Sequence, residues 1–246
     1  FLARGHGVGF EELRFTRAAF WSSRGEVNMK IAKKSLSALQ LRILSGGVLC
    51  PLVVGAIVLG GWYFMSMVML AAGITFYEWY ELVKNSRNNY RDVAIGAIYL
   101  TICFSSFVFI RLGFEQGAWL ALSTIISVWA SDTGAYIIGK NFGKIKLAPK
   151  ISPNKTWEGF ASAVIFFALS LIAMVELGDF AAPYLDADIG LKPKHIWMVF
   201  VAGCFLGAVG QAGDLFKSVY KRRAGVKDSG HLIPGHGGLL DRIDSL

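Results

Sequence analysis

Acidic residues near the C-terminal end of the chain occur in a pattern that suits phosphate chemistry. Asp214, Asp241 and Asp244 supply carboxylates, and the last two are three residues apart, so on a helix they would share a face. Glycines before Asp241 would let a ligand approach the backbone closely. Carboxylate oxygens are the ligands that Mg²⁺ prefers, and Mg²⁺ commonly links such side chains to substrate phosphates. We therefore expect a magnesium-dependent site here.

Basic residues and glycines accompany these acids. The basic ones, which would balance the charge of a bound polyanion, are Lys221, Arg222, Lys227 and Arg242. A patch that binds anionic lipid headgroups explains the basic residues equally well, but it gives the acids no role. His236 has two interpretations, either a phosphate donor or general acid, or a turn residue between glycines. Gly237 and Gly238 complete the candidate substrate-binding set.

A further carboxylate, Asp132, lies inside an apolar stretch. A charge in the middle of a membrane costs at least about 2.5 to 3.5 kcal/mol on insertion scales, so the residue needs a partner or a function. One interpretation is a structural hydrogen bond or salt bridge between helices. The favoured one is a functional acid, with Tyr136 one turn away on the same helix face.

Residues 139–156 carry five lysines and no acid. Pro153, with Ser152 or Asn154 as N-cap, predicts a helix start, and helix starts attract phosphate. Lys155 would then lie at the same level as Asp132, and it joins the candidate catalytic residues. Attachment to anionic lipid headgroups is the favoured account of the other four, Lys140, Lys144, Lys146 and Lys150.

The composition predicts which elements position these residues. Of 246 residues, 54% are hydrophobic and only 17% charged, which is too apolar for a soluble domain. Windows of about 20 apolar residues, the length that crosses a bilayer, occur at 43–61, 62–83, 93–110, 118–138, 157–177 and 196–213. We expect an all-α polytopic transmembrane helical bundle with six spans. Gly60 and Gly61 predict a tight turn that makes the first two spans antiparallel neighbours.

Basic residues alternate between the connections of these spans. Eighteen Lys and Arg residues lie in 29–42, 84–92, 139–156 and 214–246, against three in the alternate connections. Because basic loops stay on the cytoplasmic side during insertion, both ends of the membrane domain and all candidate site residues should face the cytoplasm. Cys50, Cys103 and Cys204 lie in separate apolar runs, so neither a disulfide framework nor a zinc site is indicated.

The ends of the chain predict its domain organisation. Residues 1–28 contain no apolar signal core and precede a Met29-Lys30 stretch that resembles a natural start. We expect 1–28 to be a non-native or disordered extension and 29–246 to be the membrane domain.

Residues 218–244 resemble the signature of the phosphatidate cytidylyltransferases, also called CDP-diacylglycerol synthases. The matching residues are Ser218, Lys221, Arg222, Lys227, Asp228, Gly230, Pro234, His236, Gly237, Gly238, Asp241, Arg242, Ile243 and Asp244. Tyr220 departs mildly from the pattern. Segments 131–136, 152–156 and 213–215 also resemble the family, and the likeness runs from about residue 40 to the end.

The resemblance implies an integral membrane enzyme that uses CTP, phosphatidate and Mg²⁺, with a second cation nearby, to make CDP-diacylglycerol and pyrophosphate. It implies that Asp214 and Asp241 hold metal and that Asp132 and Asp244 support the metal centre. Phosphate contacts are implied for Lys155, Lys221, Arg222 and Lys227. Members of the family normally have another span after the signature, so we expect this domain to be C-terminally truncated, in a bacterial inner membrane.

Two alternatives remain open. The first is a CTP-dependent transferase that acts on a different lipid phosphate. The second is an ion-coupled transporter that uses Asp132 as a relay, against which stand the missing internal repeat and the acids gathered on one side of the membrane. No nucleic-acid partner is expected, and assembly into a homo-oligomer is left open.

Overall fold

The computed structural model of the chain describes residues 38–185, 195–226, 228–230 and 238–241. Contacts divide the chain into two units, Phe1–Leu41 and Arg42–Leu246, and apart from the first residues of α2 the features described below belong to the second. The predicted extension, residues 1–28, lies outside the described residues, and the proposed domain boundary after residue 28 stays a prediction.

Long helices occupy all six apolar windows. Within the described residues they are α2 (Ala38–Leu59), α3 (Gly61–Val83), α4 (Asn89–Leu112), α5 (Gly117–Phe142), α6 (Trp157–Leu185) and α7 (Ile196–Arg223). The expected all-α, membrane-type architecture is confirmed. In the described part of the chain, three segments are long and apolar enough to cross a membrane, namely Asn89–Leu112, Trp157–Gly178 and Ile196–Arg223. The number of six spans therefore stays a prediction.

Large apolar side chains remain exposed on several of these helices. Trp62 of α3 is 87% exposed and Phe205 of α7 is 68% exposed. Apolar surface of this kind is costly in water and suits the hydrocarbon interior of a bilayer. The exposed apolar surface therefore agrees with the hydropathy of the helices.

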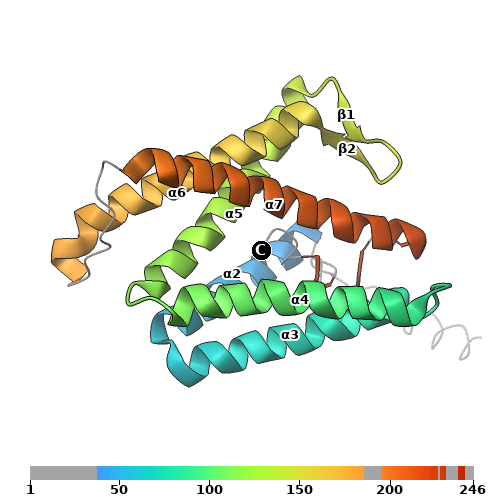
Figure 1. Ribbon diagram of the computed structural model, residues 1–246, viewed down its shortest axis with the longest axis horizontal. Coiled ribbons are helices and arrows are strands. Elements are labelled where there is room, and N and C mark those ends of the chain that lie inside the picture. Colours follow the sequence, from blue (N-terminus) through green and yellow to red (C-terminus); the bar gives the residue numbers. More distant parts are fainter. Residues whose placement is uncertain (1–37, 186–194, 227, 231–237, 242–246) are drawn as a thin grey trace, which may run out of the picture. The chain divides into compact units, whose positions relative to one another are not determined.

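The turn between α2 and α3 forms where it was predicted. Gly60 and Gly61 both have positive φ values, 65° and 49°, which favour glycine. The two helices meet near this turn, where Ile57 and Phe64 belong to one buried cluster. Farther along, among the described residues, α3 packs beside α4 instead (Figure 1). The expected antiparallel pair is therefore wrong beyond the turn. Close to the turn, Arg111 of α4 donates a hydrogen bond to the Ile57 carbonyl at 2.6 Å.

A second buried cluster joins α3, α4 and α7 to residues 238–241, the C-terminal turn of the described chain. Its residues are Trp79, Val83, Leu100, Tyr220 and Leu240. The indole N–H of Trp79 donates to the Asp92 carbonyl at 2.9 Å. The ring lies against Gly96, where any Cβ would overlap it. This packing fixes the end of α3 and with it the neighbouring residue Glu78.

A β-hairpin separates α5 from α6. β1 (Lys146–Ala148) pairs antiparallel with β2 (Ser152–Thr156), so that Lys146 lies opposite Thr156. Helix α6 begins only at Trp157, and the Thr156 hydroxyl accepts a hydrogen bond from the Gly159 N–H at 3.1 Å. The predicted start with Ser152 or Asn154 as cap is wrong. Pro153 lacks an N–H, which suits the edge strand of this two-stranded sheet as well as a helix start.

Candidate active site

Asp241 organises the C-terminal turn. Its Oδ1 accepts a hydrogen bond from Lys221 Nζ of α7 at 2.8 Å. Its Oδ2 accepts from the backbone N–H groups of Ser229 at 2.8 Å and Gly238 at 3.2 Å. Burial alone would raise the pKa of Asp241, but the Lys221 and backbone hydrogen bonds outweigh this effect and lower the pKa below its usual value. The carboxylate is therefore ionised at neutral pH.

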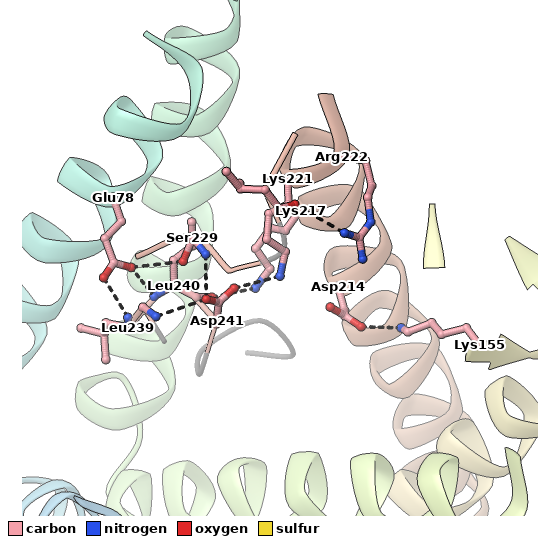
Figure 2. Close-up of polar contacts among 12 residues, drawn as sticks. Glu78, Lys155, Asp214, Lys217, Lys221, Arg222, Ser229, Leu239, Leu240 and Asp241 are labelled. Atoms are coloured by element: carbon pink, nitrogen blue, oxygen red, sulfur yellow. Dashed lines mark hydrogen bonds and ion pairs between the residues drawn. The ribbon is translucent and has the colours of Figure 1, made fainter. Parts of the chain in front are cut away.

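Glu78 of α3 holds the same turn from the other side. The side chain is buried, with 5% of the residue exposed. Its two oxygens accept hydrogen bonds from the backbone N–H groups of Leu239 at 3.0 Å and Leu240 at 2.8 Å (Figure 2). A Cβ added to Gly238 would lie 2.6 Å from Glu78 Oε2, so a glycine is needed there.

Glu78 was not among the predicted site residues, although the sequence contains a signal for it. An acid within the predicted span 62–83 requires a partner for the same reason as Asp132. Its partners are backbone groups that lie 161 and 162 residues later in the chain.

Lys155 and Asp214 form a second ion pair. Lys155 Nζ, carried by β2, lies 2.6 Å from Asp214 Oδ2 of α7, and both side chains are about one-fifth exposed. The same ammonium donates to Gln211 Oε1 at 2.9 Å. Lys155 thus reaches α7 from the hairpin, and within the described residues its ion-pair partner is Asp214 (Figure 2).

One face of α7 connects the two ion pairs. Asp214, Lys217 and Lys221 follow one another at intervals of three and four residues, which places them on the same side of a helix. Lys217 is only 2% exposed, and its ammonium lies 3.5 Å from the Leu240 carbonyl. Lys217 was not among the predicted site residues, although its spacing from Asp214 and Lys221 could have indicated it.

Arg222 contacts backbone rather than an acid. Its Nε donates to the Ile151 carbonyl at 3.0 Å, and its Nη1 lies 3.4 Å from the Val226 carbonyl. The side chain therefore ties the end of α7 to the turn of the hairpin. Its predicted contact with phosphate stays a prediction.

The remaining predicted residues are only partly described. Asp132 lies on an exposed face of α5, next to the buried Ser131, and its grouping with Asp214 and Asp241 stays a prediction. Gly238 is buried in the C-terminal turn. The other predicted residues lie outside the described part of the chain, and they are Lys227, His236, Gly237, Arg242 and Asp244. The described turn at Asp241 is not helical, and the face predicted to be shared with Asp244 stays a prediction.

Asp214 and Asp241 have the chemistry that a magnesium ion requires, because both offer carboxylate oxygens. Each is paired with a lysine, and in the described residues no three His, Cys, Asp or Glu side chains form a metal-binding group. Two carboxylates completed by water and substrate phosphates are an ordinary magnesium arrangement, so the residues fit the ion. Lys155 and Lys221 are the groups with which a cation would compete.

Comparison with known proteins connects this arrangement to a family. The family model described as "Cytidylyltransferase family" matches residues 40–114 and 84–246. The phosphatidate cytidylyltransferase of Rickettsia conorii is 37% identical over 222 residues, which cover 88% of this chain and 90% of that protein. The Rickettsia bellii protein of the same name is 38% identical over 87% of this chain and 88% of its own length. That of Bacillus subtilis is 38% identical over 72% of this chain and 62% of its own length.

Proposed function

Because the chain belongs to the cytidylyltransferase family, we propose that it transfers the cytidylyl group of CTP to phosphatidate, giving CDP-diacylglycerol and pyrophosphate. It is then a nucleotidyltransferase of phospholipid biosynthesis. The observation that carries the proposal is the similarity to phosphatidate cytidylyltransferases over nearly the whole length of both chains. The ion pairs that gather at α7 support it, since they place acids and ammonium groups together.

The reaction requires little covalent chemistry from the protein. A phosphate oxygen of phosphatidate attacks the α-phosphorus of CTP, and the bond from that phosphorus to the departing pyrophosphate breaks. Negative charge grows on the departing group. In this proposal Lys155 and Lys221, each paired with a candidate metal ligand, act on phosphate oxygens with their positive charge. Catalysis in this proposal rests on positioning and electrostatics.

Asp214 and Asp241 would hold Mg²⁺, which when bound supplies Lewis-acid stabilisation of the phosphoryl oxygens. The protein's own contribution is to hold both carboxylates in place and to keep that of Asp241 ionised. The Asp241 carboxylate accepts three hydrogen bonds that stabilise its charge, from Lys221 Nζ and from the backbone N–H groups of Ser229 and Gly238.

We also propose that this site faces the cytoplasm, in a bacterial inner membrane. The excess of Lys and Arg in alternate connections supports that orientation. A soluble nucleotide and a lipid headgroup can meet at that face.

The test is pyrophosphate release from the full chain in proteoliposomes supplied with CTP, phosphatidate and Mg²⁺. We expect release to require all three components and to stop when the metal is chelated. Asp214→Asn should lower turnover about 100-fold or more, because an amide replaces the carboxylate that would hold the Mg²⁺ acting on the reacting phosphates. Glu115→Gln, an exposed carboxylate in the connection between α4 and α5, is the matched control and should leave turnover unchanged.

Release with another lipid phosphate but not with phosphatidate would reject phosphatidate as the acceptor. Turnover of Asp214→Asn equal to that of the wild-type chain would reject the metal assignment. Thermal unfolding of both variants shows whether either change acts through folding.

A further inference from the structure

A hollow of about 520 Å³ lies where the end of α5, the β-hairpin, the start of α6 and the middle of α7 meet. Its polar lining includes Lys140, Lys146, Asn154, Lys155, Thr156 and Gln211. We call it the lysine cavity. Sites for small organic ligands commonly have volumes of roughly 300 to 1,000 Å³, so a nucleotide-sized group fits this range.

The charge of the lysine cavity is one-sided. Among the described residues, three ammonium groups and no carboxylate line it. Asp214 compensates Lys155, but within the described residues neither Lys140 nor Lys146 forms an ion pair. Lys140 instead donates a hydrogen bond to the Tyr136 hydroxyl at 3.2 Å. Two uncompensated positive charges around one hollow favour an anionic occupant.

The floor of the cavity is built by close packing. Thr156 and Gln211 are only 3% and 4% exposed. A Cβ at Gly143 would overlap the Gly139 carbonyl oxygen, and one at Gly159 would lie 3.1 Å from the Ala135 carbonyl oxygen. The backbones of α5 and α6 therefore meet around Thr156 without room for larger residues. A ligand would enter a largely preformed site.

The five lysines of residues 139–156 thus divide into two groups. Lys140, Lys146 and Lys155 line the cavity, whereas Lys144 and Lys150 do not. Attachment to lipid headgroups, favoured from the sequence for four of these lysines, would not distinguish one from another. The structure does distinguish them, because three of the five line one cavity.

We propose that the lysine cavity binds the polyphosphate of the nucleotide substrate, with Lys140 and Lys146 as binding residues. The inference rests on the proposed function. Lys155 makes the connection, because it lines the cavity and also pairs with the candidate metal ligand Asp214. The apolar groove beside α3 does not suit this ligand, since Glu78 and Glu81 are the charged residues that line it.

The experiment compares the double variant Lys140→Gln/Lys146→Gln with Lys144→Gln/Lys150→Gln, which removes the same charge from the same connection outside the cavity. Equilibrium binding of CTP and of inorganic pyrophosphate is measured for the full chain in nanodiscs of neutral lipid. The KM values for CTP and phosphatidate are measured in the same nanodiscs. We expect the cavity variant to weaken CTP and pyrophosphate binding and to raise the KM for CTP at least about tenfold. Its KM for phosphatidate, and every value of the control, should stay unchanged.

Equal effects of the two double variants would overturn the proposal, because they would reflect net charge alone. A rise only in the KM for phosphatidate would also overturn it, because the lysines would then serve the lipid headgroup. If the cavity variant loses CTP binding while the wild-type chain shows no turnover with phosphatidate, the cavity assignment stands and the proposed function falls. If the wild-type chain and the cavity variant both turn over phosphatidate with the same KM for CTP, the proposed function stands and the cavity assignment falls.

Discussion

Individual side chains show how distant parts of the sequence meet at the candidate site. Lys221, Asp214, Asp241 and Lys155 stand out in the sequence because each is charged beside apolar or glycine-rich segments. Their pairing was not predictable, since lysine–carboxylate partners depend on how the helices pack. Glu78 shows the same limit, because the backbone groups that it holds carry no signal in a single sequence.

At the scale of the residue, Glu78→Gln should loosen the turn that carries Asp241. An amide replaces one acceptor oxygen with a donor, which leaves a buried backbone N–H of Leu239 or Leu240 unsatisfied. The expected loss in the free energy of unfolding is about 1 to 3 kcal/mol. Thermal unfolding and limited proteolysis of residues 228–241 measure it.

Glu81→Gln is the control for this change. Glu81 lies one turn farther along α3 and forms a surface ion pair with Lys84 at 2.5 Å. Because exposed ion pairs contribute little, this variant should unfold like the wild-type chain. A Glu78→Gln variant with unchanged unfolding and proteolysis would contradict the role given to Glu78.

The helices and the hairpin differ in how far sequence predicts them. Each apolar window contains a helix, as its length and hydropathy predict without reference to neighbouring segments. The hairpin was missed because Lys146–Ala148 and Ser152–Thr156 are short and lack a strong alternation of apolar and polar residues. The hairpin depends on the pairing between its two strands and on the burial of Thr156. Neither can be identified from the local sequence.

At the scale of the element, we expect Gly203→Ala to destabilise the packing of α7 against α6. A Cβ there would lie 2.6 Å from the Cα of Ala168, and backbone cannot yield as a side-chain tip can. Overpacking of this kind costs about 1 to 3 kcal/mol, and it would shift the helix that carries Asp214 away from β2. We expect a lower melting temperature and lower turnover.

Gly55→Ala in α2 is the matched change, because nothing lies within 4 Å of the added Cβ. It should leave thermal unfolding unchanged. Equal melting temperatures for the two glycine variants would show that close approach of α6 and α7 is unimportant.

At the scale of the whole molecule, the proposed orientation in the membrane rests on charge alone. The connection that contains the hairpin is rich in lysine, whereas the connection between α4 and α5 carries no basic residue and follows the single Arg111 in the last turn of α4. Hydropathy and charge bias predict the path of the chain without any knowledge of its packing. The contacts that build a site across that path require the three-dimensional structure.

A labelling experiment with a membrane-impermeant maleimide tests this orientation. In a chain whose native cysteines are replaced, Glu115→Cys should react in intact bacterial cells, because it lies in the exposed connection between α4 and α5. Lys150→Cys, at the exposed hairpin turn, should react only after the membrane is opened. The reverse pattern would place the lysine-rich side outside and reject the cytoplasmic orientation.

The hold of Glu78 on a turn 161 residues later has a consequence for biosynthesis. A ribosome finishes α3 long before it makes Leu239 and Leu240, so the nascent chain carries this carboxyl group without the amides that will later satisfy it. Burying such a group unsatisfied is unfavourable, and the end of α3 should therefore settle only after translation of the C-terminal turn. Chains that stop short of residue 239 would then expose an unfinished surface that membrane quality-control proteases can recognise.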